Sequence, residues 1–359
     1  GMPQVRQRSA GNFFRDLEAN SGAELPVWNG ELYLEYHRGT YTSQARNKRA
    51  NRKSEFALHD AEFLACLANW LDPAYAYPVD SFQQAWQLVC LNQFHDIIPG
   101  SSSGEVYQES QAQYAQVQQI VSTASAQALT TIANSLGGEV LLVNPTSFIR
   151  SGPVVVPGVF DAGMALQGRT LLTQPVEAGV LVDAGELPPY SVTLLETAAA
   201  SAASFDTKAD SQEPLCLEND CLQVEFTSAG DICRIFDKAN RREVLPAGAL
   251  ANQFQAFEDR PMFWDAWDID IFYDDRVWLA EPASALRWVE RGPLRWTVEI
   301  TRRILNSTYI QRISLQRGSA RLDFETQIDW RERHILLKVV FPVEILSPVA
   351  TYDIQWGNV

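Results

Sequence analysis

The stretch LNQFHDIIPGSSSGEVY, residues 91–107, joins two helical segments through an abrupt stop. The residues before it carry apolar side chains mostly three and four positions apart, which is the spacing of one apolar helix face. Pro99 and Gly100 end that helix. Ser102, followed three residues later by Glu105, has the form of a capping box that starts the next helix one residue on. The sequence therefore predicts two helices joined by a rigid turn.

Residues 43–136 have helical periodicity throughout, with predicted helices at 48–71, 79–96 and 103–135. Three amphipathic helices with short connections predict an antiparallel three-helix bundle. In the first two helices, the side chains expected in the core include Cys66, Phe82, Trp86, Val89, Cys90 and Phe94. In the third helix they are Tyr107, Tyr114, Val117, Val121, Ala124, Ala128 and Ile132.

After Gly137 and Gly138 the sequence changes to short, β-branched segments punctuated by Pro and Gly. Residues 137–205 predict a small β module, with strands at 140–143, 152–156, 166–172, 180–182 and 191–195 and a surface linker at 198–210. Residues 206–359 predict a larger antiparallel β-sandwich, with strands at 215–226, 232–237, 287–289, 294–304, 309–315, 321–330 and 334–341. The expected fold class is a multidomain α+β protein.

The first 42 residues contain a short amphipathic helix at 12–18 and an alternating, extended stretch at 26–36. We interpret this segment as the edge of a larger domain.

The composition limits the choice of partners. The 359 residues include 44 acidic and 29 basic side chains, giving a net charge of −15, so the chain repels nucleic acid and anionic membranes. No apolar run approaches the roughly 18 residues of a membrane span. The basic run at 46–53 indicates a solvated or ion-paired helix face rather than a phosphate site. Five cysteines without a CxxC pair favour a reducing compartment.

His95 and Asp96 form the first candidate site. At the end of a helix, unpaired carbonyls and a partial negative charge would favour a cation beside this pair. Neutral imidazole is also the commonest metal ligand. The alternative is a structural, hydrogen-bonded pair.

Two further segments mix residues that suit sugar binding. His37 and Arg38 end an extended stretch and could hold sugar hydroxyls, although Arg38 could instead pair with a carboxylate at a domain junction. Trp264 and Trp267 lie among carboxylates in residues 258–270, a mixture typical of carbohydrate contact, although tryptophans in a sandwich are often core residues. These carboxylates do not follow the calcium-loop register. His59 and His334 are interpreted as surface or packing residues.

Five stretches, in this order, resemble the family 38 glycoside hydrolases, the retaining, zinc-dependent α-mannosidases, and especially their cytosolic and bacterial branch. They are residues 25–52, 91–107, 143–152, 258–270 and 321–342, so the resemblance extends over nearly the whole chain. It implies that His95 is the last zinc ligand and that Asp96 holds substrate hydroxyls. His37 and Arg38 would lie on the cleft wall, and Trp264 and Trp267 complete the candidate substrate-binding set.

In this family zinc orients the sugar ring and two carboxylates carry out a double displacement. No His-x-Asp zinc pair precedes the predicted bundle. We therefore expect residues 1–42 to be the C-terminal edge of a catalytic domain. Residues 43–136 would be the middle domain of the enzyme, and residues 206–359 a truncated C-terminal domain. The nucleophile is expected outside this chain, which would bind zinc weakly or not at all and be inactive alone.

The resemblance also implies an α-mannoside oligosaccharide as substrate, a separate N-terminal catalytic domain as partner, a cytoplasmic location and a possible homo-oligomer. Two other functions stay open. One is a non-catalytic carbohydrate-binding or structural module, which the two tryptophans favour. The other is a hydrolase for a different α-linked sugar, which would share the site and differ in pocket shape.

Overall fold

The computed structural model describes residues 5–29, 35–138, 140–158, 163–198, 215–354 and 357–358. The chain divides into two compact units, Gly1–Glu35 with Leu346–Val359, and Tyr36–Ile345. The first unit contains helix α1 (Ala10–Ser21), the 3-10 helix η1 (Gly22–Glu24) and strands β19 (Asp353–Ile354) and β20 (Gly357–Asn358).

The extended stretch predicted at 26–36 is contradicted at its C-terminal end. Residues 26–29 form no strand, residues 30–34 lie outside the described part, and Glu35–His37 is the 3-10 helix η2. A second 3-10 helix, η3 (Gly39–Tyr41), follows directly. His37 and Arg38 therefore lie in tight turns rather than at a strand end.

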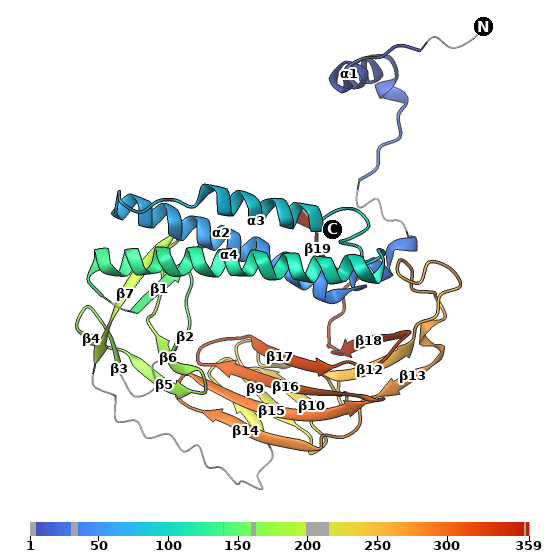
Figure 1. Cartoon of the computed structure of the whole chain (residues 1–359). Helices are drawn as coiled ribbons and strands as arrows, with labels where there is room; N and C mark the ends of the chain where they lie inside the picture. The colour runs from blue at the N-terminus through green and yellow to red at the C-terminus, as the bar shows by residue number, and fades with distance from the viewer. Residues whose placement is uncertain are drawn as a thin grey trace. The chain divides into compact units, whose positions relative to one another are not determined.

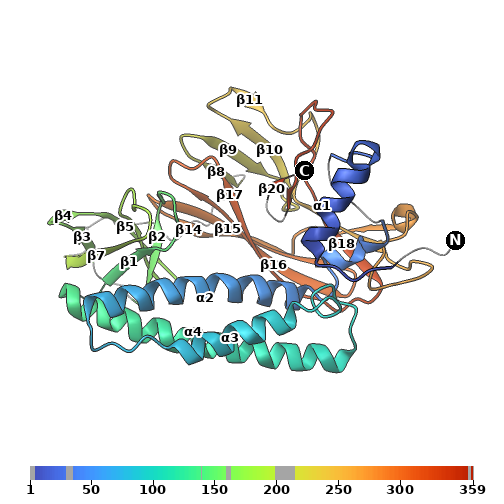
Figure 2. The same ribbon diagram turned by 90° about the horizontal axis from the view of Figure 1, so that it is seen from above.

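Helices α2 (Ala45–Leu71), α3 (Val79–Asn92) and α4 (Gly104–Leu136) lie side by side in Figures 1 and 2. They enclose an apolar core, and the seven positions expected from the third helix are all buried, four of them in this core and Ala128 and Ile132 in a second cluster. The core contains Leu58, Ala61, Ala65, Phe82, Ala85, Val89, Tyr114, Val117, Val121 and Ala124.

Polar contacts between the helices show their relative directions. Ser110 bonds Asn47, and the Tyr114 hydroxyl donates to Asn51 Oδ1 at 3.2 Å; both pairs are 63 residues apart, so α2 and α4 run parallel. Helix α3 runs in the opposite direction.

Helix α3 ends four residues earlier than the sequence predicted, and its inner face differs. The buried positions are Phe82, Ala85, Val89 and Asn92. Asn92 ends this face because its amide donates to Leu88 O and to Gln113 Oε1, at 2.9 and 2.7 Å. The expected core positions Cys90, Phe94 and Cys66 were wrong, since all three side chains are exposed. Cys90 is one position away from the stripe, and Phe94 lies beyond the helix.

The small β region contains two antiparallel sheets around one apolar core. The predicted strand at 166–172 is instead a chain reversal, because Gln167 and Gly168 have φ values of 51° and 74°. One sheet has the order β1 (Val140–Asn144), β7 (Ser191–Ala198), β3 (Gly163–Leu166), β4 (Arg169–Thr170). The other has the order β2 (Val154–Pro157), β6 (Gly179–Asp183), β5 (Leu172–Val176).

The larger β region packs two four-stranded antiparallel sheets face to face, with a third sheet of three strands beside them. The first has the order β11 (Arg242–Glu243), β10 (Ile232–Asp237), β9 (Leu222–Phe226), β8 (Cys216–Glu218). The second has the order β14 (Ala285–Arg291), β15 (Arg295–Ile304), β16 (Ser307–Gln316), β17 (Leu322–Asp329). The third has the order β13 (Val277–Leu279), β12 (Gln253–Glu258), β18 (Ile335–Val340).

Two features of this region differ from the prediction. Strands β11, β12 and β13 were missed, and the strand predicted at 215–226 is split. Asn219 causes the split, because its Oδ1 accepts from Cys221 N and Leu222 N and its amide donates to Gln316 O and Ser319 O. The linker predicted at 198–210 falls almost wholly in residues 199–214, outside the described part.

The multidomain α+β fold class is confirmed, whereas the boundaries at 42, 136 and 205 stay predictions. In the described ranges, no helix has the length and apolar character needed to cross a membrane.

Candidate functional site

The chain between α3 and α4 makes two tight turns that carry the His-Asp pair. Ile98 N donates to Phe94 O at 3.0 Å, and Gly100 N donates to Ile97 O at 3.2 Å. The buried Tyr107 hydroxyl lies 3.1 Å from Ile97 O and accepts from Ser102 N at 3.0 Å. Tyr107 was predicted only as a core residue, but its hydroxyl also supports this turn.

The predicted capping box does not form between Ser102 and Glu105. The Ser102 hydroxyl donates instead to Asp96 O at 2.6 Å, and Ser103 is the N-cap of α4. Hydrogen bonds from the backbone N–H of Glu105 and from the Ser103 side chain lower the pKa of Glu105. The start of α4 was therefore predicted to within one residue, whereas the predicted capping interaction of Ser102 with Glu105 was wrong.

His95 and Asp96 lie side by side on the surface of this turn. His95 Nε2 is 3.3 Å from Asp96 Oδ2, with side-chain exposures of 75% and 53%. The imidazole ring also contacts Phe94, with ring centroids 4.4 Å apart. The pair lies just beyond the end of α3 rather than in its last turn, and the predicted gain for a cation there stays a prediction.

Lys48 connects this turn to the segment before α2. Its ammonium group donates to three carbonyl oxygens, Ser43 O at 2.5 Å, Ile98 O at 2.8 Å and Pro99 O at 3.0 Å. Burial lowers the pKa of Lys48 to about 8. The expected solvated or ion-paired basic face holds for Arg52, which pairs with Glu55 at 2.7 Å, but it was wrong for Lys48. Lys48 is half-buried because it flanks the inner face of α2.

Three candidate segments meet at Ser43 and Gly39. They are residues 37–43, 94–100 and 264–268, and we call the region where they meet the junction. Gly39 N donates to Trp267 O at 2.7 Å, and the Ser43 hydroxyl donates to Ala266 O at 2.8 Å. Gly100 packs so tightly that a Cβ there would lie 2.6 Å from Ser43 O. The structure thus brings together segments more than 200 residues apart.

The remaining candidate residues take different positions around the junction. His37 contacts the Trp267 ring edge-on, with centroids 5.0 Å apart, and Trp267 is half-buried. Trp264 is 69% exposed and has a φ of 61°, which lets Trp267 N donate to Trp264 O at 2.7 Å. Arg38 is half-buried between η2 and η3. Neither tryptophan is a fully buried core residue.

A half-buried acid, Asp259, lies in the same loop as the tryptophans. Burial is the main cause that raises the pKa of Asp259; Asp265 and Asp268 add to the rise, and His334 opposes it. One carboxyl oxygen of Asp259 is buried without a hydrogen-bond partner. Asp259 N donates to His334 O at 2.8 Å, so the loop is held at its base by the residue before β18.

The candidate metal ligands of the described chain do not form a complete zinc site by themselves. Among the described residues, no group of three His, Cys, Asp or Glu side chains could hold a metal ion. One imidazole and one adjacent carboxylate do not fit the four-coordinate shell that zinc prefers.

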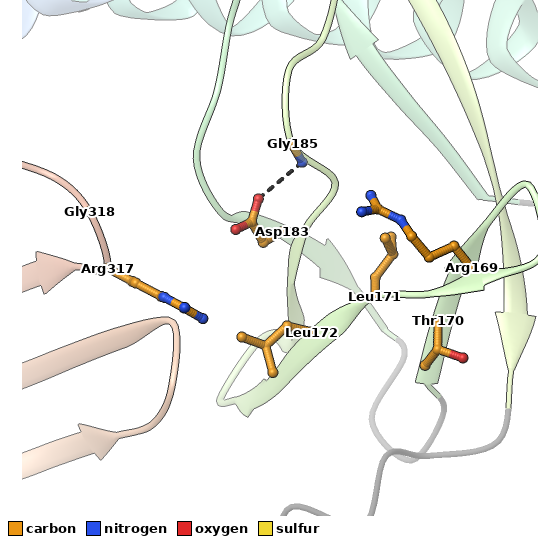
Figure 3. Close-up of a pocket in the computed structure, with 8 residues that line it drawn as sticks. All are labelled: Arg169, Thr170, Leu171, Leu172, Asp183, Gly185, Arg317 and Gly318. Carbon is orange, nitrogen blue, oxygen red and sulfur yellow. Dashed lines mark hydrogen bonds between the residues drawn. The ribbon is translucent and has the colours of Figure 1, made fainter.

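A separate cavity of about 430 Å³ lies between the small and larger β regions. Figure 3 shows Arg169 and Arg317 approaching it from two different regions, with the Asp183 carboxylate bound to Gly185 N at 3.0 Å. The buried Gln174 holds these regions together, because its Oε1 accepts from the backbone N–H of Leu294 and Arg295. The residues lining the cavity include none of the candidate site residues.

Two family models match most of the chain. The alpha mannosidase middle domain matches residues 35–132, which include His37, His95 and the junction's first two segments. The glycosyl hydrolases family 38 C-terminal domain matches residues 217–359. The chain carries the middle and C-terminal domains of glycosyl hydrolase family 38. The predicted resemblance is thereby confirmed at the level of the family.

Individual relatives agree with this assignment. Alpha-mannosidase 2C1 of Mus musculus is 33% identical over the whole of this chain, and alpha-mannosidase G of Dictyostelium discoideum is 29% identical. The chain spans about a third of the length of these relatives, 34% and 36%. The crystal structure of an alpha-mannosidase from Enterococcus faecalis V583 matches 96% of the chain with a TM-score of 0.77; at 17% identity it supports the fold alone.

Proposed function

We propose that this chain is part of a retaining, zinc-dependent α-mannosidase that hydrolyses terminal α-mannosides of oligosaccharides. In this proposal His95 supplies one zinc ligand and Asp96 contacts substrate hydroxyls. His37, Arg38, Trp264 and Trp267 line the cleft. The nucleophile and the other zinc ligands come from a catalytic domain outside this chain, which is its principal partner.

The observation that carries the proposal is the junction. Three segments selected from the sequence for their chemistry, far apart along the chain, are linked through Ser43, Gly39 and Gly100. His95 and Asp96 have exposed side chains on a turn that is hydrogen-bonded from below by Tyr107 and Lys48. A rigid turn with an exposed imidazole suits a ligand that completes its metal site with residues of another domain.

The test compares two histidine variants in a longer protein that includes the catalytic domain. We expect His95→Ala to lose bound zinc and most turnover of an aryl α-mannoside, because one ligand of a tetrahedral site is missing. His59→Ala is the matched control, since His59 is half exposed on α2 and should change neither quantity. Near-normal zinc content in His95→Ala would make His95 a structural residue.

A non-catalytic carbohydrate-binding module is the second candidate, and the exposure of Trp264 favours it. Titration calorimetry of the 359-residue chain with a mannose oligosaccharide discriminates between the two functions. Binding that Trp264→Ala abolishes, combined with normal turnover in His95→Ala of the longer protein, would support the module. A different α-linked sugar as substrate would appear as preferential turnover of another aryl glycoside.

The proposed location is the cytoplasm, supported by the five free cysteines at 66, 90, 216, 221 and 233. A homo-oligomer is also compatible with this proposal, and sedimentation of the longer protein would measure it.

A further inference from the structure

We propose that Lys48 is the positioning residue of the candidate site, which fixes the turn that carries His95 and Asp96 against the segment at Ser43. Its importance for a reaction rests on the proposed function. Its mechanical role at the junction does not depend on that function.

The hydrogen bonds of Lys48 match the capacity of its ammonium group. A protonated lysine has three N–H donors and no acceptor. In this structure it has three acceptors, the carbonyl oxygens of Ser43, Ile98 and Pro99. All its polar partners in the described chain are therefore uncharged backbone groups, which makes Lys48 a connector rather than a member of an ion pair. Charge-assisted hydrogen bonds of this kind are roughly twice as strong as neutral ones.

The positions of the three carbonyls give Lys48 its connecting role. Ser43 precedes α2, whereas Ile98 and Pro99 lie 50 and 51 residues further along the chain than Lys48. Lys48 itself lies in the first turn of α2, whose inner face is part of the bundle core. A rigid helix therefore serves as the common support of two irregular segments.

Other contacts at the turn cannot replace this link. Tyr107 and Asn47 donate to Ile97 O at 3.1 and 3.4 Å, so these two hydrogen bonds hold the turn to helices α4 and α2 and not to Ser43. The packing of Gly100 against Ser43 O involves no donor. The Ser43 hydroxyl extends the connection to Ala266 in the tryptophan loop. Loss of Lys48 should therefore loosen the turn relative to Ser43 while leaving the helices packed.

The test measures amide hydrogen exchange in the 359-residue chain. The reporters are the hydrogen-bonded amides of Ser43, Ile98 and Gly100. In Lys48→Met we expect their protection to fall by about tenfold or more, because hydrogen bonds to a charged donor are lost. Core amides of α2 and α4 should keep their protection.

Two further variants make the result specific. Lys48→Arg keeps a charged donor and should restore most of the lost protection. Arg49→Met, an equally large change at an exposed neighbouring residue, should leave protection unchanged. Unchanged protection in Lys48→Met, or a uniform loss throughout the bundle, would overturn the inference.

A second readout separates this inference from the proposed function. In the longer protein, Lys48→Met should keep more zinc than His95→Ala and lose turnover, since the imidazole is still present but on a looser turn. Full turnover in that variant, despite lost protection, would show that the connection does not position the site. Normal activity in His95→Ala would refute the proposed function instead, and the exchange data would still decide whether Lys48 holds the turn.

Discussion

Replacing Gly100 with alanine should displace the junction, and its cost can be worked out from two separate features. Gly100 has a φ of 100°, and a Cβ there would lie 2.6, 2.7 and 2.8 Å from O, Cβ and C of Ser43. A non-glycine residue at positive φ costs about 1–2 kcal/mol, and overpacking typically adds about 1–3 kcal/mol. The combined loss in free energy of unfolding is about 2–5 kcal/mol.

Gly137 provides the matched control for this substitution. It also has positive φ, 73°, but a Cβ would meet nothing within 4 Å. Gly137→Ala should therefore cost only the conformational part, about 1–2 kcal/mol. The assay is urea unfolding followed by the helical circular dichroism signal. Equal losses for Gly100→Ala and Gly137→Ala would refute the reasoning, because the packing against Ser43 would then contribute nothing.

Three further predictions concern other parts of the chain. Asp231 and Arg302 form a nearly buried ion pair at 2.8 Å. Asp231→Ala should lower the free energy of unfolding by about 3–5 kcal/mol, because it leaves Arg302 buried without its partner, and the Asp231→Ala, Arg302→Met double variant should lose less. Equal losses for the two variants in urea denaturation would contradict this. The pKa of Lys48 is about 8 in the folded chain, against an ordinary value of 10.5. Between these pH values the unfolded state binds more protons than the folded state. The free energy of unfolding should therefore rise with pH across that window. Cys216 and Cys233, whose pKa values are raised by burial, titrate near this window in both proteins, so the measure of Lys48 is a larger rise from pH 7 to 10 in the native chain than in Lys48→Met. Cys66, Cys90 and Cys233 are exposed and free, so a thiol reagent should modify all three rapidly in the folded chain. A rapid phase of undiminished size in the Cys66→Ser, Cys90→Ser, Cys233→Ser variant would contradict their assignment.

Element ends show where the sequence became insufficient. Helix and strand interiors follow local periodicity, so the apolar face of α4 and the bounds of β10 were predicted closely. The end of α3 and the break after β8 were not, because Asn92 and Asn219 form side-chain hydrogen bonds to residues 21 and about 100 positions away. Such partners cannot be read from a local pattern.

The candidate site shows the same difference between what local sequence patterns predict and what long-range contacts decide. The sequence by itself determined the α+β architecture and the three segments with suitable chemistry, since residue types and periodicity are local properties. Only the tertiary structure decided that these segments meet, and that Lys48, Ser43 and Gly100 join them. The physical reason is that this meeting depends on hydrogen bonds and close packing between residues 50 to more than 200 positions apart, and these contacts exist only once the helices and sheets have packed.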